Sequence, residues 1–578
     1  MENNKIRIAI VGGGPAALFM FKRLLELGNT NIEITIFEKK RQFGAGMPYS
    51  SEGANEEHIT NVSANEIPHI VTSIRDWVQT VSSDILNLFS IEAERFNEYK
   101  VLPRLFFGKY LSGQFDLLYA QAKEKGILTE LKSGSEVTDI KFMSDTLEVS
   151  VEVNTQDRHV FDKVIICTGH NWPKRYEGKV QGYFDSPYPP SKLRKGFNHT
   201  IGIKGASLTA IDAIRTIARY NGKFTEDSTG MLVFTVSQET PDFNIVMHTR
   251  HGFLPAVRFH LEDSHLKSDS LLTEEDLSAH RMKNDGFLSL DYLFEKDFKD
   301  QFKDENPDFY AKIRNMTMED FVASMMEIRE ELDPFQLLRA EYIQAEKSIK
   351  RQESVYWKEM LAILSFALNY PAKYLSAEDT LRMQKTLLPL ISLVIAFIPQ
   401  TSCRELLALH DAGRLELVAV GNDSKEQVEE ERGGITITYT ADAGNAKSAY
   451  YKTYVDCVGQ PHLNYEDFPF KSMIEDKTIS AATIRFKDDT NGEEALQDYP
   501  ERVQRYSEGY RLSVSGIAIN DNFQVTDSYG AFNDHIYIMA VPYIGGYNPD
   551  YSGLDFCEEA SGRIAKWLTD EFKSSNAV

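Results

Sequence analysis

The sequence has few cysteines and no pairing pattern among them. Cys167, Cys403, Cys457 and Cys557 are scattered over 578 residues, and no two of them form a C-x-x-C pair. This spacing argues against a disulfide framework, a zinc site and a dithiol redox centre. We therefore expect no metal site and no cysteine pair that carries electrons.

Long apolar runs and an excess of positive charge are also absent. The longest apolar run, residues 387–397, is shorter than the roughly 20 residues of a membrane span and predicts a buried helix. Lys and Arg number 63 against 86 Asp and Glu, a formal net charge of −23 that disfavours nucleic acid and anionic membranes as partners. A strand and a glycine turn stand where a signal peptide would lie. We expect a cytoplasmic protein that binds neither nucleic acid nor membranes, in an oligomeric state that the sequence does not specify.

The chain is too long for one hydrophobic core, and its pattern predicts two strand–turn–helix units. The first unit has its strands at residues 6–11, 32–37 and 164–167 and its helix at residues 16–27. The second has strands at residues 200–203, 244–249, 415–420, 434–439 and 450–458, with a helix that begins at Leu208. Residues 422–432 are expected to form a solvated excursion from a strand region.

The turn of the first unit fits the G-x-G-x-x-A pattern of dinucleotide-binding domains, in Gly12-Gly13-Gly14-Pro15-Ala16-Ala17. Gly12 allows the tight turn, and Gly14 lets the backbone approach a pyrophosphate that lies on the helix N-terminus. Glu38, at the end of the next strand, is placed to accept hydrogen bonds from the ribose. The alternative is a tight turn without a ligand, but strand, helix and acid together favour a dinucleotide.

Further motifs extend this pattern along the chain. They are Gly44-Ala45-Gly46-Met47-Pro48-Tyr49, Asn61-Val62-Ser63-Ala64, the P-R-x-x-x-G-x-Y-L run at residues 103–111, and Cys167-Thr168-Gly169-His170. Together these segments resemble the FAD-NAD(P)-binding family that includes urate hydroxylase-like and aspartate N-monooxygenase-like flavoproteins. The resemblance covers most of the chain except the helical insertion, and it is specific for the family but not for a substrate.

The resemblance implies an α/β fold with two Rossmann-like domains, a discontinuous FAD domain and a helical insertion. The insertion, residues 262–400, shows charge-rich helical periodicity, for example at residues 309–321 and 337–350. The expected boundaries are 1–195 and 461–578 for the FAD domain, and 196–261 and 401–460 for the NAD(P)-binding-like domain.

The same resemblance names the residues expected at FAD. They are Gly12, Gly14, Pro15, Ala16, Glu38, Lys39, Gly46, Met47, Asn61, Arg104, Val137, Thr168, Gly169 and Gly545. An arginine near a phosphate turn can neutralise a pyrophosphate, although Arg104 in a surface ion pair is the alternative. His170 and Asn61 are the candidate catalytic residues, and a histidine that only closes the turn is an equal alternative. The tail at residues 544–553 is expected to close over the flavin.

The second turn, Gly205-Ala206-Ser207-Leu208-Thr209, has a serine where the family often has a second glycine. Ser207 either holds the backbone away from a pyrophosphate or donates to a phosphate, and Lys204 adds a positive charge. Arg250 ends the next strand, where an NADP-specific site usually holds the 2′-phosphate. We expect NADPH at Gly205, Ser207, Leu208, Thr209 and Arg250. The alternative is a domain that has lost its cofactor.

These features predict an FAD-dependent oxidoreductase. The leading hypothesis is an NADPH-dependent monooxygenase that uses O2 to hydroxylate a small polar metabolite. The alternatives are a flavin dehydrogenase or oxidase without oxygen insertion, and a flavin-binding protein that acts through a partner. The absence of a C-x-x-C pair disfavours the disulfide-reductase class of flavoproteins.

Overall fold

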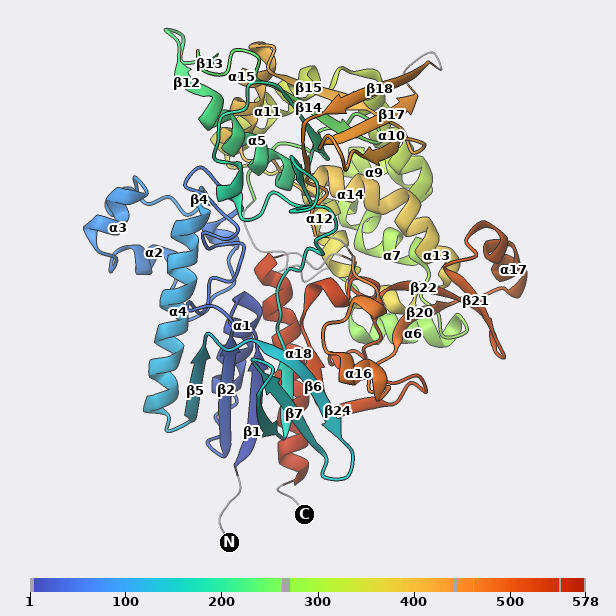
Figure 1. Cartoon of the computed structure of the whole chain (residues 1–578). Coiled ribbons are helices and arrows are strands. Elements are labelled where there is room, and N and C mark those ends of the chain that lie inside the picture. Colours follow the sequence, from blue (N-terminus) through green and yellow to red (C-terminus); the bar gives the residue numbers. More distant parts are fainter. Residues whose placement is uncertain (1–4, 262–270, 441–444, 461, 550–552, 576–578) are drawn as a thin grey trace.

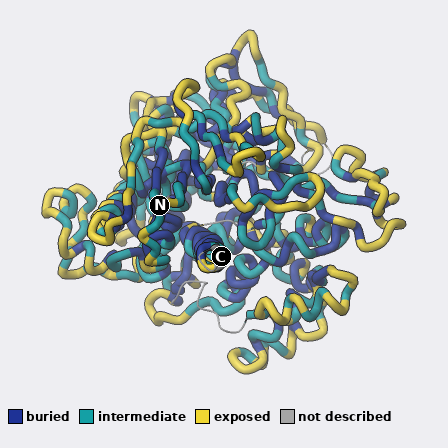
Figure 2. The backbone as a smooth tube through the Cα atoms, turned by 90° about the horizontal axis from the view of Figure 1, so that it is seen from below, coloured by how far each residue is buried: buried dark blue, intermediate teal, exposed yellow. Residues whose placement is uncertain are grey.

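The computed structural model describes residues 5–261, 271–440, 445–460, 462–549 and 553–575. Two sheets of mostly parallel strands occupy opposite ends of the molecule, and a body of helices lies beside them (Figure 1). Figure 2 shows that the buried backbone runs through the middle of each part, whereas exposed turns lie at the rim. Among the described residues, no helix has both the length and the apolar character needed to cross a membrane.

The first sheet has the strand order β23-β24-β9-β1-β2-β5, with all neighbours except β23 parallel. The strands are β1 (Ile6–Val11), β2 (Ile32–Glu38), β5 (Leu128–Ser133), β9 (Lys163–Ile166), β23 (Gln524–Thr526) and β24 (Phe532–Ile538). Ile10 of β1 lies opposite Ile36 on one side and Ile165 on the other. The antiparallel strands β7 (Glu148–Val153) and β8 (Asp157–Phe161) pack on one face of this sheet, where Phe161 lies edge-on to Phe37. In the described chain, the covering helix that the apolar run of β1 predicted is present on the other face only. Because β24 pairs with β9, segments from both halves of the chain build this sheet.

Helix α1 (Pro15–Glu26) follows β1 and begins with a proline at its first position, where the missing N–H costs no hydrogen bond. Helix α18 (Gly553–Ser575) packs along α1, and Glu558 of α18 forms ion pairs with Lys22 and Arg23. Helix α4 (Arg104–Glu124) packs against α1 and β5. These contacts fix the turn at the start of α1 between sheet and helices.

The second sheet is entirely parallel and has the order β10-β19-β11-β14-β15. Its strands are β10 (Tyr183–Phe184), β11 (Thr200–Lys204), β14 (Asn244–Thr249), β15 (Leu415–Ala419) and β19 (Thr453–Asp456), and helices α5 (Leu208–Asn221) and α15 (Gln400–Asp411) pack beside it. The sheet β16 (Lys425–Val428), β17 (Ile435–Thr440) and β18 (Ala446–Tyr451) is antiparallel. The expected excursion at residues 422–432 is therefore wrong in part, because β16 pairs with β17 as a charged edge strand.

Helices α6 to α14 form the body between β14 and α15. They are α6 (Glu274–Lys283), α7 (Leu290–Asp297), α8 (Phe302–Glu305), α9 (Pro307–Ile313), α10 (Met318–Glu331), α11 (Pro334–Arg351), α12 (Tyr356–Ala367), α13 (Ala377–Arg382) and α14 (Leu388–Ile395). Most of them share a core of their own around Phe298, Phe321 and Leu361. The helical periodicity expected at residues 309–321 is interrupted, because Thr317 accepts a hydrogen bond from the Asp320 N–H and caps α10.

Short antiparallel elements complete the described chain. They are β3 (Ile59–Ser63) with β4 (Val101–Pro103), β6 (Val137–Met143) with β7 (Glu148–Val153) and β8 (Asp157–Phe161), β12 (Gly222–Glu226) with β13 (Leu232–Val236), and β20 (Ala481–Arg485) with β21 (Val503–Tyr506) and β22 (Gly509–Ile517). Helices α2 (Ile74–Val78), α3 (Ser83–Leu88), α16 (Lys471–Glu475) and α17 (Asp489–Asp498) lie in the connections.

Candidate functional site

The turn between β1 and α1 has the shape that a pyrophosphate requires. Gly12 has a φ of +109°, and a Cβ at this position would lie 2.6 Å from the carbonyl oxygen of Cys167. Gly14 caps α1 with a φ of −84° and contributes no side-chain cap, so the first N–H groups of the helix stay open to an anion. A Cβ at Gly14 would lie 3.3 Å from the Cα of Gly46, so a side chain at position 14 would crowd the space beside the helix N-terminus.

The carboxylate of Glu38 is held beside this turn. It accepts hydrogen bonds from the backbone N–H of Gly13 at 2.7 Å and from the N–H of Lys40 at 2.8 Å. Each oxygen uses one of its acceptor sites for these bonds and keeps a second one for a ligand. Glu38 thus occupies the end of β2 in an orientation suited to ribose hydroxyls.

A cavity of about 1500 Å³ opens at the carboxyl ends of β1 and β9. It brings together most of the residues expected at FAD, and its lining includes Gly12, Gly14, Pro15, Ala16, Glu38, Lys39, Gly46, Met47, Asn61, Val137, Thr168, Gly169 and His170. This is the crevice beside the strand where the order of a doubly wound sheet reverses, the usual place for a ligand. Single ligands occupy about 300–1,000 Å³, so the cavity has room for more than one.

The polar groups of this cavity fit a dinucleotide. The hydroxyl oxygen of Thr168 is buried and has no hydrogen-bond partner among the described residues, although it adjoins the backbone against which Gly12 packs. Burying a hydroxyl without a partner costs about 1–3 kcal/mol, and a bound ligand would supply the partner. The open helix end, the acid and this hydroxyl are complementary to phosphate and ribose groups.

Two of the residues expected at FAD lie elsewhere. Arg104 is half-buried, forms a 2.5 Å ion pair with Asp212 of α5 and donates to the carbonyl oxygen of Ile59 at 3.0 Å. It ties helix α5 to the β3 segment and does not line the cavity. Gly545 is also buried away from the cavity, in the turn whose next residue, Gly546, donates to the carbonyl oxygen of Ser515.

The tail contributes other residues to the cavity. Val541, Tyr543, Gly553 and Leu554 line it, whereas Asp550, Tyr551 and Ser552 lie outside the described residues. The expected closure of residues 544–553 over the flavin therefore remains a prediction for the segment between Gly545 and Gly553.

The turn of the second unit repeats the first one closely. Gly205 has a φ of +97°, and a Cβ there would lie 3.0 Å from the carbonyl oxygen of Cys457. Ser207 caps α5 with a φ of −84°, the same value as Gly14, and its side chain makes no capping hydrogen bond. The serine is therefore accommodated without backbone strain, because this position needs no left-handed conformation. Leu208 and Thr209 follow as the first two residues of α5.

The charged residues near this second turn differ in their surroundings. Lys204 forms a 2.8 Å ion pair with Glu426 of β16, so its charge is already neutralised. The side chain of Arg250 is exposed after the end of β14 and has no hydrogen bond or ion pair with a described residue. Its backbone carbonyl accepts a hydrogen bond from the N–H of Gly421, which fixes the position of the chain there. Among the residues described, nothing competes with an anion for the guanidinium of Arg250.

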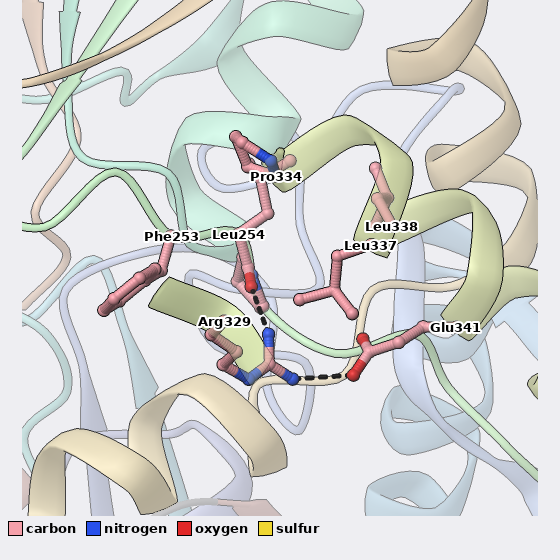
Figure 3. Close-up of a pocket in the computed structure, with 8 residues that line it drawn as sticks. Phe253, Leu254, Arg329, Pro334, Leu337, Leu338 and Glu341 are labelled. Atoms are coloured by element: carbon pink, nitrogen blue, oxygen red, sulfur yellow. Dashed lines mark hydrogen bonds and ion pairs between the residues drawn. The ribbon is translucent and has the colours of Figure 1, made fainter. Parts of the chain in front are cut away.

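The helical body holds the loop that follows Arg250. Arg329 of α10 is buried, donates to the carbonyl oxygen of Leu254 at 3.1 Å and forms a 2.7 Å ion pair with Glu341 of α11 (Figure 3). Lys358 of α12 shares this carboxylate at 3.2 Å, and burial lowers the pKa of its ammonium group. Breaking such a buried pair costs about 3–5 kcal/mol, so these contacts hold the loop firmly against α10 and α11.

The strand ends of the two units meet directly. The side chain of Gln460 accepts a hydrogen bond from the Asn171 N–H and donates one to the Asn171 carbonyl, each at 2.8 Å. The indole N–H of Trp172 donates to the Gly459 carbonyl at 3.0 Å. The turns after β9 and β19 therefore lie against one another at the cavity.

His170 stands at this junction. Its Nδ1 lies 3.2 Å from the Gln460 side-chain oxygen, and its ring lies 5.3 Å from that of Trp172. The protein around the ring lowers the pKa of His170, because burial disfavours the charged imidazolium, while the hydrogen bond to Gln460 acts in the opposite direction. Water still reaches the ring through the cavity. A neutral histidine here can donate or accept one hydrogen bond toward a ligand.

Sequence reasoning missed several residues of the cavity. Glu66 and Arg258 line it as a buried ion pair, and Phe366, Ile395 and Phe397 reach it from the helical body. Helical periodicity does not indicate which apolar positions face a cavity, so no signal in the sequence marked the last three. Arg258 belongs to none of the motifs recognised in the sequence, although an arginine within the largely apolar run at residues 253–259 was a usable signal.

Two segments of the chain match known protein families. Residues 9–171 match the family described as FAD-NAD(P)-binding, and residues 273–395 match the YdhS-like middle domain. The uncharacterized protein YdhS of Escherichia coli K12 is 28% identical over 471 residues, which cover 81% of this chain and 86% of that protein.

Solved structures show a weaker likeness. The ornithine N-hydroxylase of Kutzneria sp. 744 is 12% identical with a TM-score of 0.45, over 98% of this chain and 100% of that chain. The cadaverine monooxygenase of Erwinia amylovora is 11% identical with a TM-score of 0.44, over 97% and 94%. At these values neither structure bears on substrate or reaction. The family match over residues 9–171, together with the glycine turn, the acid and the cavity, confirms the predicted FAD-NAD(P)-binding domain and the mixed α/β fold.

Proposed function

We propose that this protein is an NADPH-dependent monooxygenase that carries FAD. The observation that supports this most strongly is the direct contact between the two units beside the cavity, which the turn after β1 and the turn after β9 line. The strand ends after β9 and β19 are joined by Gln460 and Asn171, and that arrangement brings the reactive ends of two dinucleotides toward each other. The FAD-dependent oxidoreductase class follows from the family match, and the monooxygenase reaction is our proposal.

The chain's own residues have separate tasks in this proposal. The turn from Gly12 to Gly14 binds the FAD pyrophosphate, Glu38 orients the ribose, and Thr168 donates to the cofactor at the end of β9. When bound, FAD accepts hydride from the nicotinamide and supplies the electrons that activate O2. The surrounding side chains position both nucleotides and exclude water from the reacting atoms.

NADPH is the proposed electron donor because of Arg250. Its guanidinium is exposed and unpaired among the described residues, at the end of the second strand of its unit. An NADP-specific site holds its 2′-phosphate at this place, and a guanidinium can bind a phosphate through two parallel hydrogen bonds. The unstrained backbone of Ser207 keeps the N-terminus of α5 usable for the pyrophosphate.

The cysteines disfavour a disulfide-reductase reaction. All four are free and buried, and they occur in four separate segments of the chain. Burial raises the pKa of the Cys167 and Cys557 thiols, which line the cavity, so neither is a reactive thiolate at neutral pH. Without a thiol acceptor, O2 is the acceptor that we propose.

A second candidate is a flavoprotein whose second domain has lost its nucleotide. It is favoured by one observation, the ion pair between Lys204 and Glu426, which removes a positive charge from the second turn and adds a carboxylate near it. Under this alternative the flavin would receive electrons from another donor.

Steady-state oxidation of NADPH by the purified protein separates these possibilities. A monooxygenase consumes NADPH and O2 in equal amounts and releases little peroxide once a substrate is present. An oxidase releases peroxide in proportion to the electrons it receives. A protein with a vestigial second domain oxidises neither NADPH nor NADH, yet retains bound FAD.

A further inference from the structure

The cavity extends beyond the residues that form the nucleotide turn. Part of its lining, which we call the insertion-side pocket, consists of Asn61, Glu66, Arg258, Phe366, Ile395 and Phe397. These residues come from the β3 segment, from the chain after β14 and from the helical body. Since the whole cavity of about 1500 Å³ exceeds the 300–1,000 Å³ of a typical single-ligand site, this pocket remains available for a second molecule.

A buried ion pair forms the polar part of the insertion-side pocket. The side chains of Arg258 and Glu66 are 4% and 6% exposed and contact each other directly. Arg258 also donates to the carbonyl oxygen of Asn61 at 2.5 Å and to the Ser63 hydroxyl at 3.0 Å. The pair carries no net charge, so an ionised ligand would find no unpaired counter-charge on it.

The same pair retains unused hydrogen-bonding capacity. The Nε–H of Arg258 and the Oε2 atom of Glu66 have no hydrogen bond with a described residue, because the bonds of this pair use Nη1, Nη2 and Oε1. Two N–H groups of Arg258, on Nε and Nη1, and the Oε2 atom of Glu66 therefore remain for a ligand. A neutral group that both donates and accepts, such as an amide, matches this combination.

The rest of the insertion-side pocket is mostly apolar. Phe366 of α12 and Ile395 of α14 are only half-buried, whereas their neighbours Ser365 and Val394 are almost fully buried. Phe397 is buried and packs edge-on against Phe259, with ring centroids 5.0 Å apart. Apolar surface exposed inside a cavity is covered favourably by an apolar ligand body.

We propose that the insertion-side pocket binds a small neutral molecule with a largely apolar body and one amide-like polar group, and that this molecule is the substrate of the flavoenzyme. The role as substrate rests on the proposed monooxygenase function, whereas the binding itself does not. The proposed ligand differs from the small polar metabolite expected from the sequence, because it is uncharged and polar at one group only. The proposal also gives the helical body a role, because two of its helices form the apolar wall.

A matched set of aromatic probes tests the proposed chemistry. Benzamide, benzoate and benzylamine share one ring and differ in charge, and each is titrated into the FAD-loaded full-length protein while the flavin absorbance is followed. We expect benzamide to perturb the spectrum at concentrations at least about tenfold lower than the two ions, because desolvating an unpaired charge is costly. Tighter binding of either ion would overturn the neutral class.

Variants of the ion pair and of the apolar wall test the location. Glu66→Gln leaves Arg258 without its counter-charge, so benzoate should bind at least about tenfold more tightly than to the unchanged protein. Phe366→Ala should weaken benzamide by roughly tenfold through lost apolar contact. Phe532→Ala, at a position 47% exposed on β24, is the matched control and should leave all three affinities unchanged.

A further variant fills the pocket without altering the ion pair, so the test still applies if a substitution at the pair disturbs the fold. Ile395→Trp enlarges a half-buried side chain at the pocket wall and leaves the ion pair in place, so it should abolish benzamide binding while FAD stays bound. Unaltered benzamide binding in both Phe366→Ala and Ile395→Trp would overturn the pocket. If benzamide binding does not respond to these variants while the unchanged protein oxidises NADPH normally, this inference alone is refuted. If the unchanged protein does not oxidise NADPH, the proposed function is refuted.

Discussion

Gln460 and Asn171 exchange two hydrogen bonds of 2.8 Å, one in each direction between the side-chain amide and the backbone of Asn171. Gln460 follows β19 of the second sheet, and Asn171 follows β9 of the first. A side-chain amide that pairs with a backbone unit in this way fixes both distance and direction. Together with the hydrogen bond from Trp172 to the Gly459 carbonyl, this contact holds the turns after β9 and β19 against one another.

Removing the Gln460 amide should slow flavin reduction and leave FAD bound. In Gln460→Ala the turns after β9 and β19 lose both hydrogen bonds of 2.8 Å. We expect the rate of flavin reduction by NADPH to fall by about tenfold, because a misplacement of reacting groups by about 1 Å can have effects of this size or larger. Anaerobic stopped-flow absorbance measures the rate. The exposed Gln504 offers a control, Gln504→Ala, which should not alter it. An unchanged rate in Gln460→Ala would show that the contact does not align the nucleotides.

The first glycine of the turn should be indispensable for FAD. An alanine at Gly12 meets the Cys167 carbonyl at 2.6 Å and also carries the strain of a φ of +109°. Gly126 has a φ of +69°, and no atom lies within 4 Å of the place that an added methyl group would take. Gly126→Ala therefore shares the strain of about 1–2 kcal/mol but not the collision.

The flavin content of the two purified variants is the readout. Gly126→Ala should retain FAD near the level of the unchanged protein, and Gly12→Ala should purify without it. Equal FAD content in both variants would contradict the placement of the pyrophosphate at this turn.

Arg250→Ala should discriminate between the two nicotinamide nucleotides. A charge-assisted hydrogen bond contributes about 1.5–3 kcal/mol, so the KM for NADPH should rise by roughly ten- to hundredfold while that for NADH changes little. Lys447→Ala, an exposed cation on β18, controls for a general change in surface charge. Small and equal effects on NADPH and NADH would favour the second candidate, a domain without a nucleotide.

His248 should make stability depend on pH. Burial lowers its pKa to about 4 from the ordinary value of 6.5, and its Nε2 lies 3.0 Å from the Tyr451 hydroxyl. The unfolded chain takes up this proton at a higher pH than the folded chain, so stability falls as the pH drops below 6.5 toward 4. The loss through this group is about 2 kcal/mol between pH 8 and pH 5.

Urea-induced unfolding at pH 8 and pH 5 measures this loss. The variant His248→Asn keeps a polar side chain that does not titrate, so its stability should decline less over the same interval, by about 2 kcal/mol. The same pH dependence in both proteins would show that His248 is not held neutral by the fold.

The fold class and the first turn were predictable because their signals are local. The continuous apolar run of β1, the glycines of the turn and the acid of β2 depend on neighbouring residues and on backbone geometry. Arg104 could not be placed in this way, since its partner Asp212 belongs to the other sheet's helix and a tertiary contact decides its orientation. The same applies to Phe366 and Ile395, whose cavity-facing positions depend on how the helical body packs.

Ser207 shows what a departure from a sequence pattern leaves open. From the sequence, a serine in place of the second glycine either holds the backbone away from a pyrophosphate or donates to a phosphate. The structure gives this residue the same φ as Gly14, so the backbone has no need of glycine there. Whether the side chain obstructs or donates depends on its rotamer beside a ligand, which composition and spacing do not specify.

Anaerobic reduction of the purified protein tests the central claim most directly. The protein should be yellow, should release FAD on denaturation, and should lose its flavin absorbance on mixing with NADPH at least about tenfold faster than with an equal concentration of NADH, as the contact with Arg250 requires. Protein that binds no FAD, or FAD that neither nucleotide reduces, would contradict the proposal that the two turns bring FAD and NADPH together.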